Sequence, residues 1–116
     1  MENRFVKEIK ENKVEINRGL STQVVDQFAN GYFDWIYIDT THSYETIIEE
    51  LELYRSKVKE NGIIAGHDYI VGNWDGLVRY GVIEAVYEFC VKYNWEILYL
   101  TNELNIKPSF AIRKII

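Results

Sequence analysis

The sequence predicts an α/β domain with a mostly parallel sheet whose last strand runs antiparallel. Two short apolar runs, residues 35–38 and 63–65, are bounded by polar residues or glycine and have the length of buried strands. The helical stretch between them is long enough for a crossover, which favours a βαβ unit with parallel strands. Residues 95–100 and 110–112 predict two more strands, joined by a polar segment that contains Pro108.

The N-terminal part of the chain predicts a helix, a brief strand and a second helix. Residues 3–11 have the pattern of a short amphipathic helix. Residues 14–16 are typical of a brief strand. Ser21 or Thr22 can cap the next helix, which is expected to stop near residues 30–31, an Asn-Gly pair.

The crossover helix is predicted from a cap, an apolar stripe and a stop signal. Ser43 is its expected N-cap, and residues 61–62, again Asn-Gly, are expected to end it and to open the next strand. Apolar or aromatic side chains recur at helical spacing at Tyr44, Ile47, Ile48, Leu51 and Tyr54. Its acidic side chains are expected to form one solvated face: Glu45, Glu49, Glu50 and Glu52.

A long loop and a second clear helix follow. The loop runs from Tyr69 to Tyr80, and a loop of about a dozen residues in a compact domain is often functional. Tyr69, Trp74 and Tyr80 are candidates to line a substrate pocket, and packing of these rings onto the domain is the alternative. The helix after the loop carries one apolar face, which includes Cys90.

Composition limits the classes of protein to which the chain can belong. Its 116 residues are enough for a single α/β domain, residues 1–116. The 13 basic and 18 acidic residues give a net charge of −5, which argues against a nucleic-acid partner. No apolar run approaches the roughly 20 residues of a membrane span. Cys90 is the single cysteine, so no internal disulfide can form, and a reducing, cytoplasmic location is expected.

Acidic residues stand at the ends of the two parallel strands. Asp39 follows the first strand and Asp68 follows the second. Ligands of open α/β sheets bind at the carboxyl ends of the strands, so both acids are expected at the working edge. His42 and His67, the two histidines of the chain, each lie within three residues of one of these aspartates. The pattern predicts a catalytic or metal site there, whereas capping of turns is the structural alternative.

Three segments resemble class I S-adenosylmethionine-dependent methyltransferases, in the small-molecule O-methyltransferase-like branch. They are residues 38–45 (IDTTHSYE), 66–69 (GHDY) and 81–86 (GVIEAV). The resemblance implies a partial Rossmann-like methyltransferase sheet, S-adenosylmethionine as cofactor and a small-molecule acceptor methylated at oxygen. It covers only the C-terminal part of the family's domain.

The resemblance also assigns roles to individual residues. Asp39 and Asp68 match acids that bind magnesium in related O-methyltransferases, and Ser21 matches a serine that lies near the adenine of the cofactor. His67 replaces one of the family's carboxylates, which favours either a transition metal or a metal-free site with His67 as base. His42 is a second candidate base, and satisfaction of its ring by local backbone is an equally weighted alternative. Strand alternation would send either His67 or Asp68 away from a shared ligand.

Two parts of the family's fold have no counterpart in these residues. They are the first strand with its glycine-rich loop and the next strand with its acidic residue for the ribose hydroxyls. In the family these strands lie between those matching residues 14–16 and 35–38, so the latter strand is expected to be a bare sheet edge. Self-association through that edge, or a changed position of residues 13–18, should follow.

Two other functions compete with the enzyme hypothesis. The chain alone is expected to be inactive, so it could instead be a non-catalytic module that binds a second copy or a missing N-terminal segment. A metal-dependent hydrolase or hydroxylase-like domain using Asp39, His67 and Asp68 is the third hypothesis. An upstream glycine-rich segment would favour the enzyme, and tight metal binding without cofactor binding would favour the third.

Overall fold

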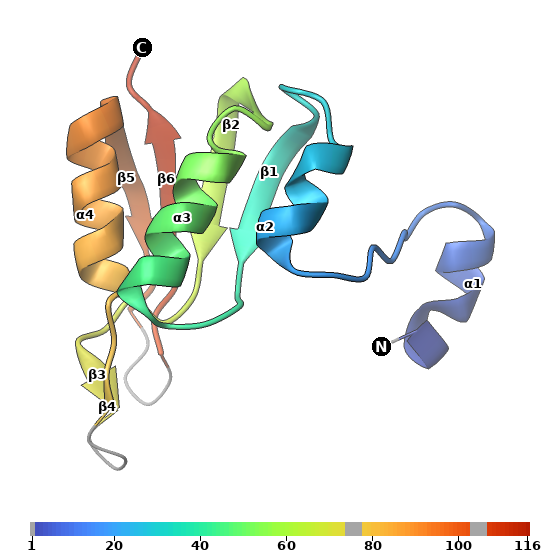
Figure 1. The fold of residues 1–116 in the computed structure, drawn as a ribbon, viewed down its shortest axis with the longest axis horizontal. Coiled ribbons are helices and arrows are strands. Elements are labelled where there is room, and N and C mark those ends of the chain that lie inside the picture. Colours follow the sequence, from blue (N-terminus) through green and yellow to red (C-terminus); the bar gives the residue numbers. More distant parts are fainter. Residues whose placement is uncertain (1, 74–77, 103–106) are drawn as a thin grey trace.

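The computed structural model describes residues 2–73, 78–102 and 107–116 (Figure 1). In chain order the elements are η1 (Glu2–Phe5), α1 (Val6–Lys10), α2 (Ser21–Val24), η2 (Val25–Gln27), β1 (Phe33–Ile38), α3 (Tyr44–Tyr54), β2 (Val58–Gly66), β3 (Gly72–Asn73), β4 (Val78–Arg79), α4 (Val82–Tyr93), β5 (Trp95–Leu100) and β6 (Phe110–Lys114). None of the helices in these ranges is long and apolar enough to cross a membrane.

The main sheet has four strands in the order β1-β2-β6-β5. Strands β1 and β2 are parallel, and α3 is the crossover between them. Strand β6 is antiparallel to both of its neighbours, β2 and β5. The predicted fold class is therefore confirmed, including the antiparallel last strand.

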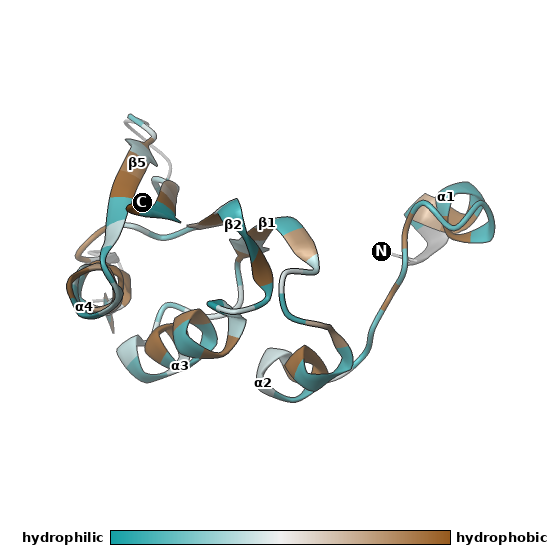
Figure 2. Cartoon of the chain, turned by 90° about the horizontal axis from the view of Figure 1, so that it is seen from above, coloured by the Kyte–Doolittle hydropathy of each residue, from teal (hydrophilic) through white to brown (hydrophobic). Residues whose placement is uncertain are grey.

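One face of this sheet is covered by α2, α3 and α4 (Figure 2). Side chains of α3 and α4 interdigitate there with those of β2 and β6, since Leu51, Phe89, Ile64 and Ile112 are fully buried. The predicted stripe on α3 and the apolar face of α4 supply half of the buried residues of this core, and the strands supply the other half. Burial of apolar side chains from both layers is the main force that holds the helices on the sheet.

The opposite face of the sheet carries exposed aromatic rings. Strand alternation points Ile36 and Ile38 toward the helices and Trp35 and Tyr37 away from them. In register, one row across this face is Tyr37, Ala65, Ala111 and Tyr99. The residues Trp35, Tyr37 and Tyr99 are 62%, 45% and 68% exposed, so this face is apolar and open.

Strand β1 is an edge of the sheet in the part of the chain that the structure describes. The predicted strand at residues 14–16 is wrong, because residues 14–18 have no regular structure and pair with no described strand. A strand needs a neighbour for its backbone hydrogen bonds, and none is placed there. Figure 1 instead shows α1 at the end of an extended segment, apart from the sheet. The two predicted consequences of the bare edge, self-association or a changed position of residues 13–18, remain predictions.

The crossover helix ends earlier than the sequence predicts. It stops at Tyr54, and β2 begins at Val58, so Asn61-Gly62 lies inside the strand and does not end the helix. The pairing with β1 jumps from Phe33↔Val58 to Trp35↔Ile63, which marks a bulge that contains Gly62. A Cβ atom at Gly62 would come within 2.8 Å of the Asp34 carbonyl oxygen, so the bulge requires glycine.

Candidate functional site

The carboxyl ends of β1 and β2 lie side by side. Ile38 and Gly66, their last residues, are paired in register, and the His67 N–H donates to the Ile38 carbonyl at 3.2 Å. Asp39 and His67 are the residues that follow directly. Because the two strands are parallel, their tips meet at one edge of the sheet, where the sequence places the site.

Asp39, His67 and Asp68 form one group at this edge. Each offers a ligand atom, and these atoms all lie within 4.8 Å of one another. His67 Nδ1 is 3.3 Å from Asp68 Oδ1 and 3.8 Å from Asp39 Oδ1. The side chain of Asp39 is 63% exposed and that of Asp68 is 17% exposed, so the group opens toward solvent on the Asp39 side.

A left-handed turn brings His67 and Asp68 to the same side. The prediction that alternation would separate them is wrong because β2 ends at Gly66, before either residue. Asp68 has φ of 63°, in the left-handed region that Asp and Asn tolerate better than most residues. The turn is held by the Tyr69 N–H, which donates to the Pro108 carbonyl at 3.0 Å.

The donor set suits either a divalent cation or a proton relay. The two carboxylates can ligate Mg²⁺ through oxygen, and together with the imidazole they can ligate a transition ion such as Mn²⁺ or Zn²⁺. Alternatively, the carboxylates hold an N–H on Nδ1 of His67, which leaves Nε2 free to accept a proton. Both uses need the three side chains where the structure places them.

His42 lies outside this group. Its ring stacks on Tyr80, with centroids 4.0 Å apart and planes 12° apart, and its Nδ1 is buried without a hydrogen-bond partner among the described residues. The His42 carbonyl accepts from the Gly81 N–H at 2.8 Å, which ties the β1–α3 loop to the start of α4. Its role as a base remains a prediction, and the geometry shows a packed ring.

The candidate pocket aromatics have different surroundings in the structure. Tyr69 packs against the core with its ring centroid 5.8 Å from that of Phe110, and burial raises the pKa of its hydroxyl. Tyr80 is buried between loop and helix, and Lys107 Nζ lies 5.2 Å from its ring centroid. The Tyr80 hydroxyl raises the pKa of Lys107 above its ordinary value. Trp74 lies outside the described residues.

Glu50 lies in a different environment from the solvated face that is predicted for it. It is 1% exposed, not part of a solvated face, and its carboxylate accepts hydrogen bonds from Ser21 Oγ and Thr40 Oγ1, both at 2.6 Å. One signal was present: Glu50 lies three residues after Ile47 and four before Tyr54, on the apolar stripe. Ser21 is therefore held by α3, at the start of α2.

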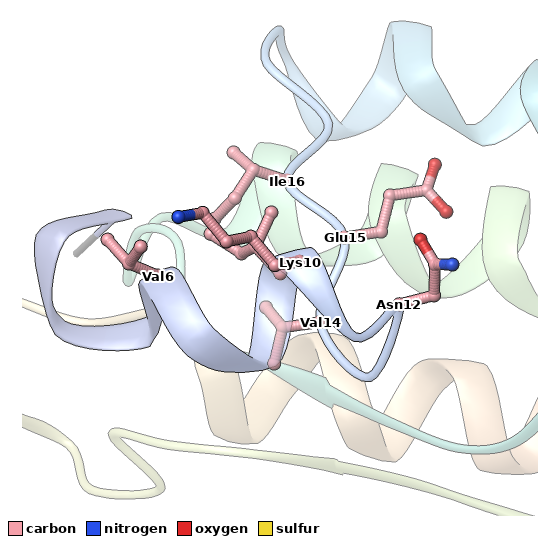
Figure 3. A pocket seen from close by; sticks show the side chains of 7 residues that line it. Val6, Lys10, Asn12, Val14, Glu15 and Ile16 are labelled. Carbon is pink, nitrogen blue, oxygen red and sulfur yellow. The ribbon is translucent and has the colours of Figure 1, made fainter.

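A cavity of about 640 Å³ lies on the N-terminal arm, residues 2–20, and not at the strand tips. Val6, Ile9, Val14 and Ile16 supply its apolar wall, with Lys10, Asn12 and Glu15 at its margin (Figure 3). Helix α1 buries none of its residues, so the arm exposes apolar side chains around this hollow. The sequence pattern of residues 2–20 does not predict this hollow.

Sheet order, a parallel βαβ unit and an acidic edge define a methyltransferase-like α/β domain. The sequence matches the family described as "Methyltransferase domain" over residues 2–69, which is more than half of the chain. The chain therefore belongs to this methyltransferase-domain family, which confirms the resemblance. No curated protein sequence matches it.

Solved structures of methyltransferases share the fold. One is a candidate caffeoyl-CoA O-methyltransferase from Staphylococcus aureus, with TM-score 0.66, 18% identity, and coverage of 97% of this chain and 57% of that chain. Another is a candidate rRNA methylase from Clostridium thermocellum, with TM-score 0.65, 18% identity, and coverage of 98% and 67%.

A third is a candidate DNA modification methylase from Thermus thermophilus, with TM-score 0.62, 11% identity, and coverage of 83% and 52%. At these identities the likeness shows the fold alone. This chain spans about half the length of the first of the structures it matches.

Proposed function

We propose that this domain takes part in methyl transfer from S-adenosylmethionine to an oxygen of a small molecule. The family match supports the reaction class, and the Asp39–His67–Asp68 group at the strand tips supports the place where it occurs. The net charge of −5 disfavours a nucleic-acid acceptor, because a backbone of phosphates would be repelled. The single observation that carries the proposal is the convergence of these three side chains at one edge.

The reaction requires a proton acceptor near the methyl acceptor. S-adenosylmethionine supplies an electrophilic methyl group, and transfer to a hydroxyl gives a methyl ether, S-adenosylhomocysteine and a proton. His67 is the proposed acceptor of that proton, on Nε2, and the position of its Nδ1 beside the two carboxylates supports this role. Holding the hydroxyl beside this nitrogen and in line with the methyl group supplies most of the remaining rate enhancement.

In the alternative, metal-dependent form of the reaction, Asp39 and Asp68 are the proposed ligands of a divalent cation such as Mg²⁺, and His67 is a third donor in place of its role as base. When bound, the cation lowers the pKa of an acceptor hydroxyl. The residues fit the ion because their donor atoms already lie within 4.8 Å of one another. Ser21 is the proposed cofactor contact by resemblance, and Tyr69 and Trp74 remain proposed substrate contacts because of their place in the loop between β2 and α4.

Calorimetric titration with S-adenosylhomocysteine, with and without Mg²⁺ or Mn²⁺, tests the proposal. Binding of S-adenosylhomocysteine with a micromolar Kd that requires the strand-tip residues would support the proposal. His67→Ala should weaken this binding only if His67 ligates the metal. No binding of S-adenosylhomocysteine under any of these conditions would contradict a cofactor site in this chain.

A partner-binding module is the second candidate function, and two surfaces favour it. The outer edge of β1 pairs with no described strand, and the face beside it exposes Trp35 and Tyr37. The arm adds unburied apolar side chains on α1. Analytical ultracentrifugation should then show a dimer that Trp35→Lys, a charge on the open face next to the edge, converts to monomer. A wild-type monomer at all concentrations would exclude self-association.

A further inference from the structure

Glu50 is a buried carboxylate that joins three separate segments. It belongs to α3, Ser21 begins α2, and Thr40 follows β1 directly after Asp39. Its two oxygens accept from different hydroxyls, Oε2 from Ser21 and Oε1 from Thr40, at 2.6 Å each. This is a short distance for a hydroxyl that donates to a carboxyl oxygen.

The same helix holds Ser21 at a second atom. One turn after Glu50, the Tyr54 hydroxyl donates to the Ser21 carbonyl at 2.7 Å. Ser21 is thus fixed by its side chain and by its backbone, both to α3. Thr40 is fixed through its side chain alone among the contacts described.

A buried carboxylate is unfavourable unless its oxygens are hydrogen-bonded, so a structure seldom keeps one in a core without a reason. An apolar residue at position 50 would continue the buried stripe of Ile47, Leu51 and Tyr54, and replacement of a buried charged group by an apolar one is often neutral or stabilising. What an apolar residue could not do is hold two hydroxyls from segments distant in sequence. The two hydrogen bonds of Glu50 are therefore better explained by the placement of the two hydroxyls than by a gain in the stability of the fold.

We propose that Glu50 is a positioning residue that fixes the Ser21 segment against the tip of β1. This rests on the proposed function, in which Ser21 contacts the cofactor and Asp39 belongs to the strand-tip site. Glu50 sets the distance between these two parts of the site by binding Ser21 on one side and Thr40, the neighbour of Asp39, on the other.

Glu50 also sets the direction of the two hydroxyls. Each donates its single proton to the carboxylate, so toward a ligand each can only accept a hydrogen bond. Ser21 Oγ is then suited to an amino group of a ligand and not to a carbonyl oxygen.

The first experiment needs no ligand. Amide hydrogen exchange of Ser21→Ala, compared with wild type, should rise by about fivefold or more at residues 39–41, although Ser21 touches none of them in the contacts described. Thr40→Val should raise exchange at residues 20–23 in the same way. Unchanged exchange at the distant segment in both variants would overturn the proposal that Glu50 joins the two segments. Neither variant removes Glu50, so both should fold.

The second experiment measures function at the same residue. Glu50→Gln should raise the Kd for S-adenosylhomocysteine about tenfold, because the NH₂ group that replaces one carboxyl oxygen cannot accept, so one of the two hydroxyls must turn its proton away from residue 50. Glu49→Gln is the matched control, since it removes the same charge from the exposed neighbouring residue and should change the Kd little. Equal effects of the two variants would overturn the positioning role. If wild type binds no S-adenosylhomocysteine, the proposed function fails. The exchange experiment still tests whether Glu50 joins the two segments.

Discussion

Substitution of Gly81 by alanine should push apart the N-termini of α3 and α4 and disturb the site from a distance. A Cβ atom at residue 81 would lie 2.4 Å from Tyr44 Cβ, 2.5 Å from Tyr44 N and 2.6 Å from Tyr44 Cα. Ordinary contact distances begin near 3.4 Å, so the two helix starts must separate by about 1 Å. Two of the three atoms belong to the backbone and cannot rotate away.

The expected loss follows from overpacking and from one hydrogen bond. Overpacking of this kind costs about 1–3 kcal/mol, and the Gly81 N–H that donates to the His42 carbonyl at 2.8 Å should lengthen its hydrogen bond. A weakened backbone hydrogen bond adds about 1 kcal/mol. We therefore expect Gly81→Ala to lower the free energy of unfolding by about 2–4 kcal/mol. Urea unfolding followed by tryptophan fluorescence measures it.

A local readout separates this mechanism from general damage. His42 stacks on Tyr80, so displacement of the loop should shift the NMR resonances of the His42 ring. Gly31→Ala is the control, because residue 31 has φ of 69° and no atom within 4 Å of an added Cβ. It should cost about 1 kcal/mol through backbone strain alone and leave the His42 resonances in place. A stability change below about 0.5 kcal/mol for Gly81→Ala, with unshifted His42 signals, would refute the steric argument.

Three further outcomes are expected. Asp68→Asn should weaken Mn²⁺ binding at least about tenfold, whereas Asp34→Asn, away from the strand tips, should not. Equal Kd values of the two variants in a metal titration would show that Asp68 does not bind the metal. Leu51→Ala should lower the free energy of unfolding by about 2–5 kcal/mol because Leu51 is fully buried. Leu53→Ala, on the exposed side of α3, should change it by less than about 1 kcal/mol. Similar losses for the two variants in urea unfolding would contradict the assignment of the buried and exposed faces of α3. Burial raises the pKa of the Cys90 thiol from 9.0 to about 11, so the folded state holds this proton more tightly, and its contribution to stability is present below pH 9 and lost as the pH rises through about 11. Between these pH values the free energy of unfolding should fall less steeply with pH for Cys90→Ala than for wild type. Identical slopes would show that the pKa of the thiol is not shifted.

Much of the helical layer could be predicted because its signals are local. Ser43 is the N-cap of α3, and its Oγ accepts from the Thr46 N–H at 3.4 Å, as the cap pattern predicts. The spacing of apolar residues on α3 and α4 identified the buried faces. The same pattern failed at Glu50, because a polar residue on an apolar stripe is buried only when other segments supply its hydrogen bonds. Those donors lie 29 and 10 residues away in the sequence.

Part of the candidate site could be predicted for a similar reason. Parallel strands must bring their carboxyl ends to one edge, so the nearness of Asp39 and Asp68 followed from the βαβ pattern. Whether His67 and Asp68 could share a ligand depended on the backbone after β2. The left-handed conformation of Asp68 decided it, and that conformation has no signature in the apolar pattern.

The sequence by itself determined the parallel crossover, the antiparallel last strand, the helix faces and the acidic strand tips, since each depends on spacing along a short segment or on the chirality of the chain. Only the tertiary structure decided that residues 14–18 form no strand, that β2 starts at Val58 and that Glu50 joins Ser21 to Thr40. The physical reason is common to all three. Strand pairing and burial of a carboxylate are favourable only with partners that are distant in the sequence, and the position of those partners is fixed when the helices pack on the sheet.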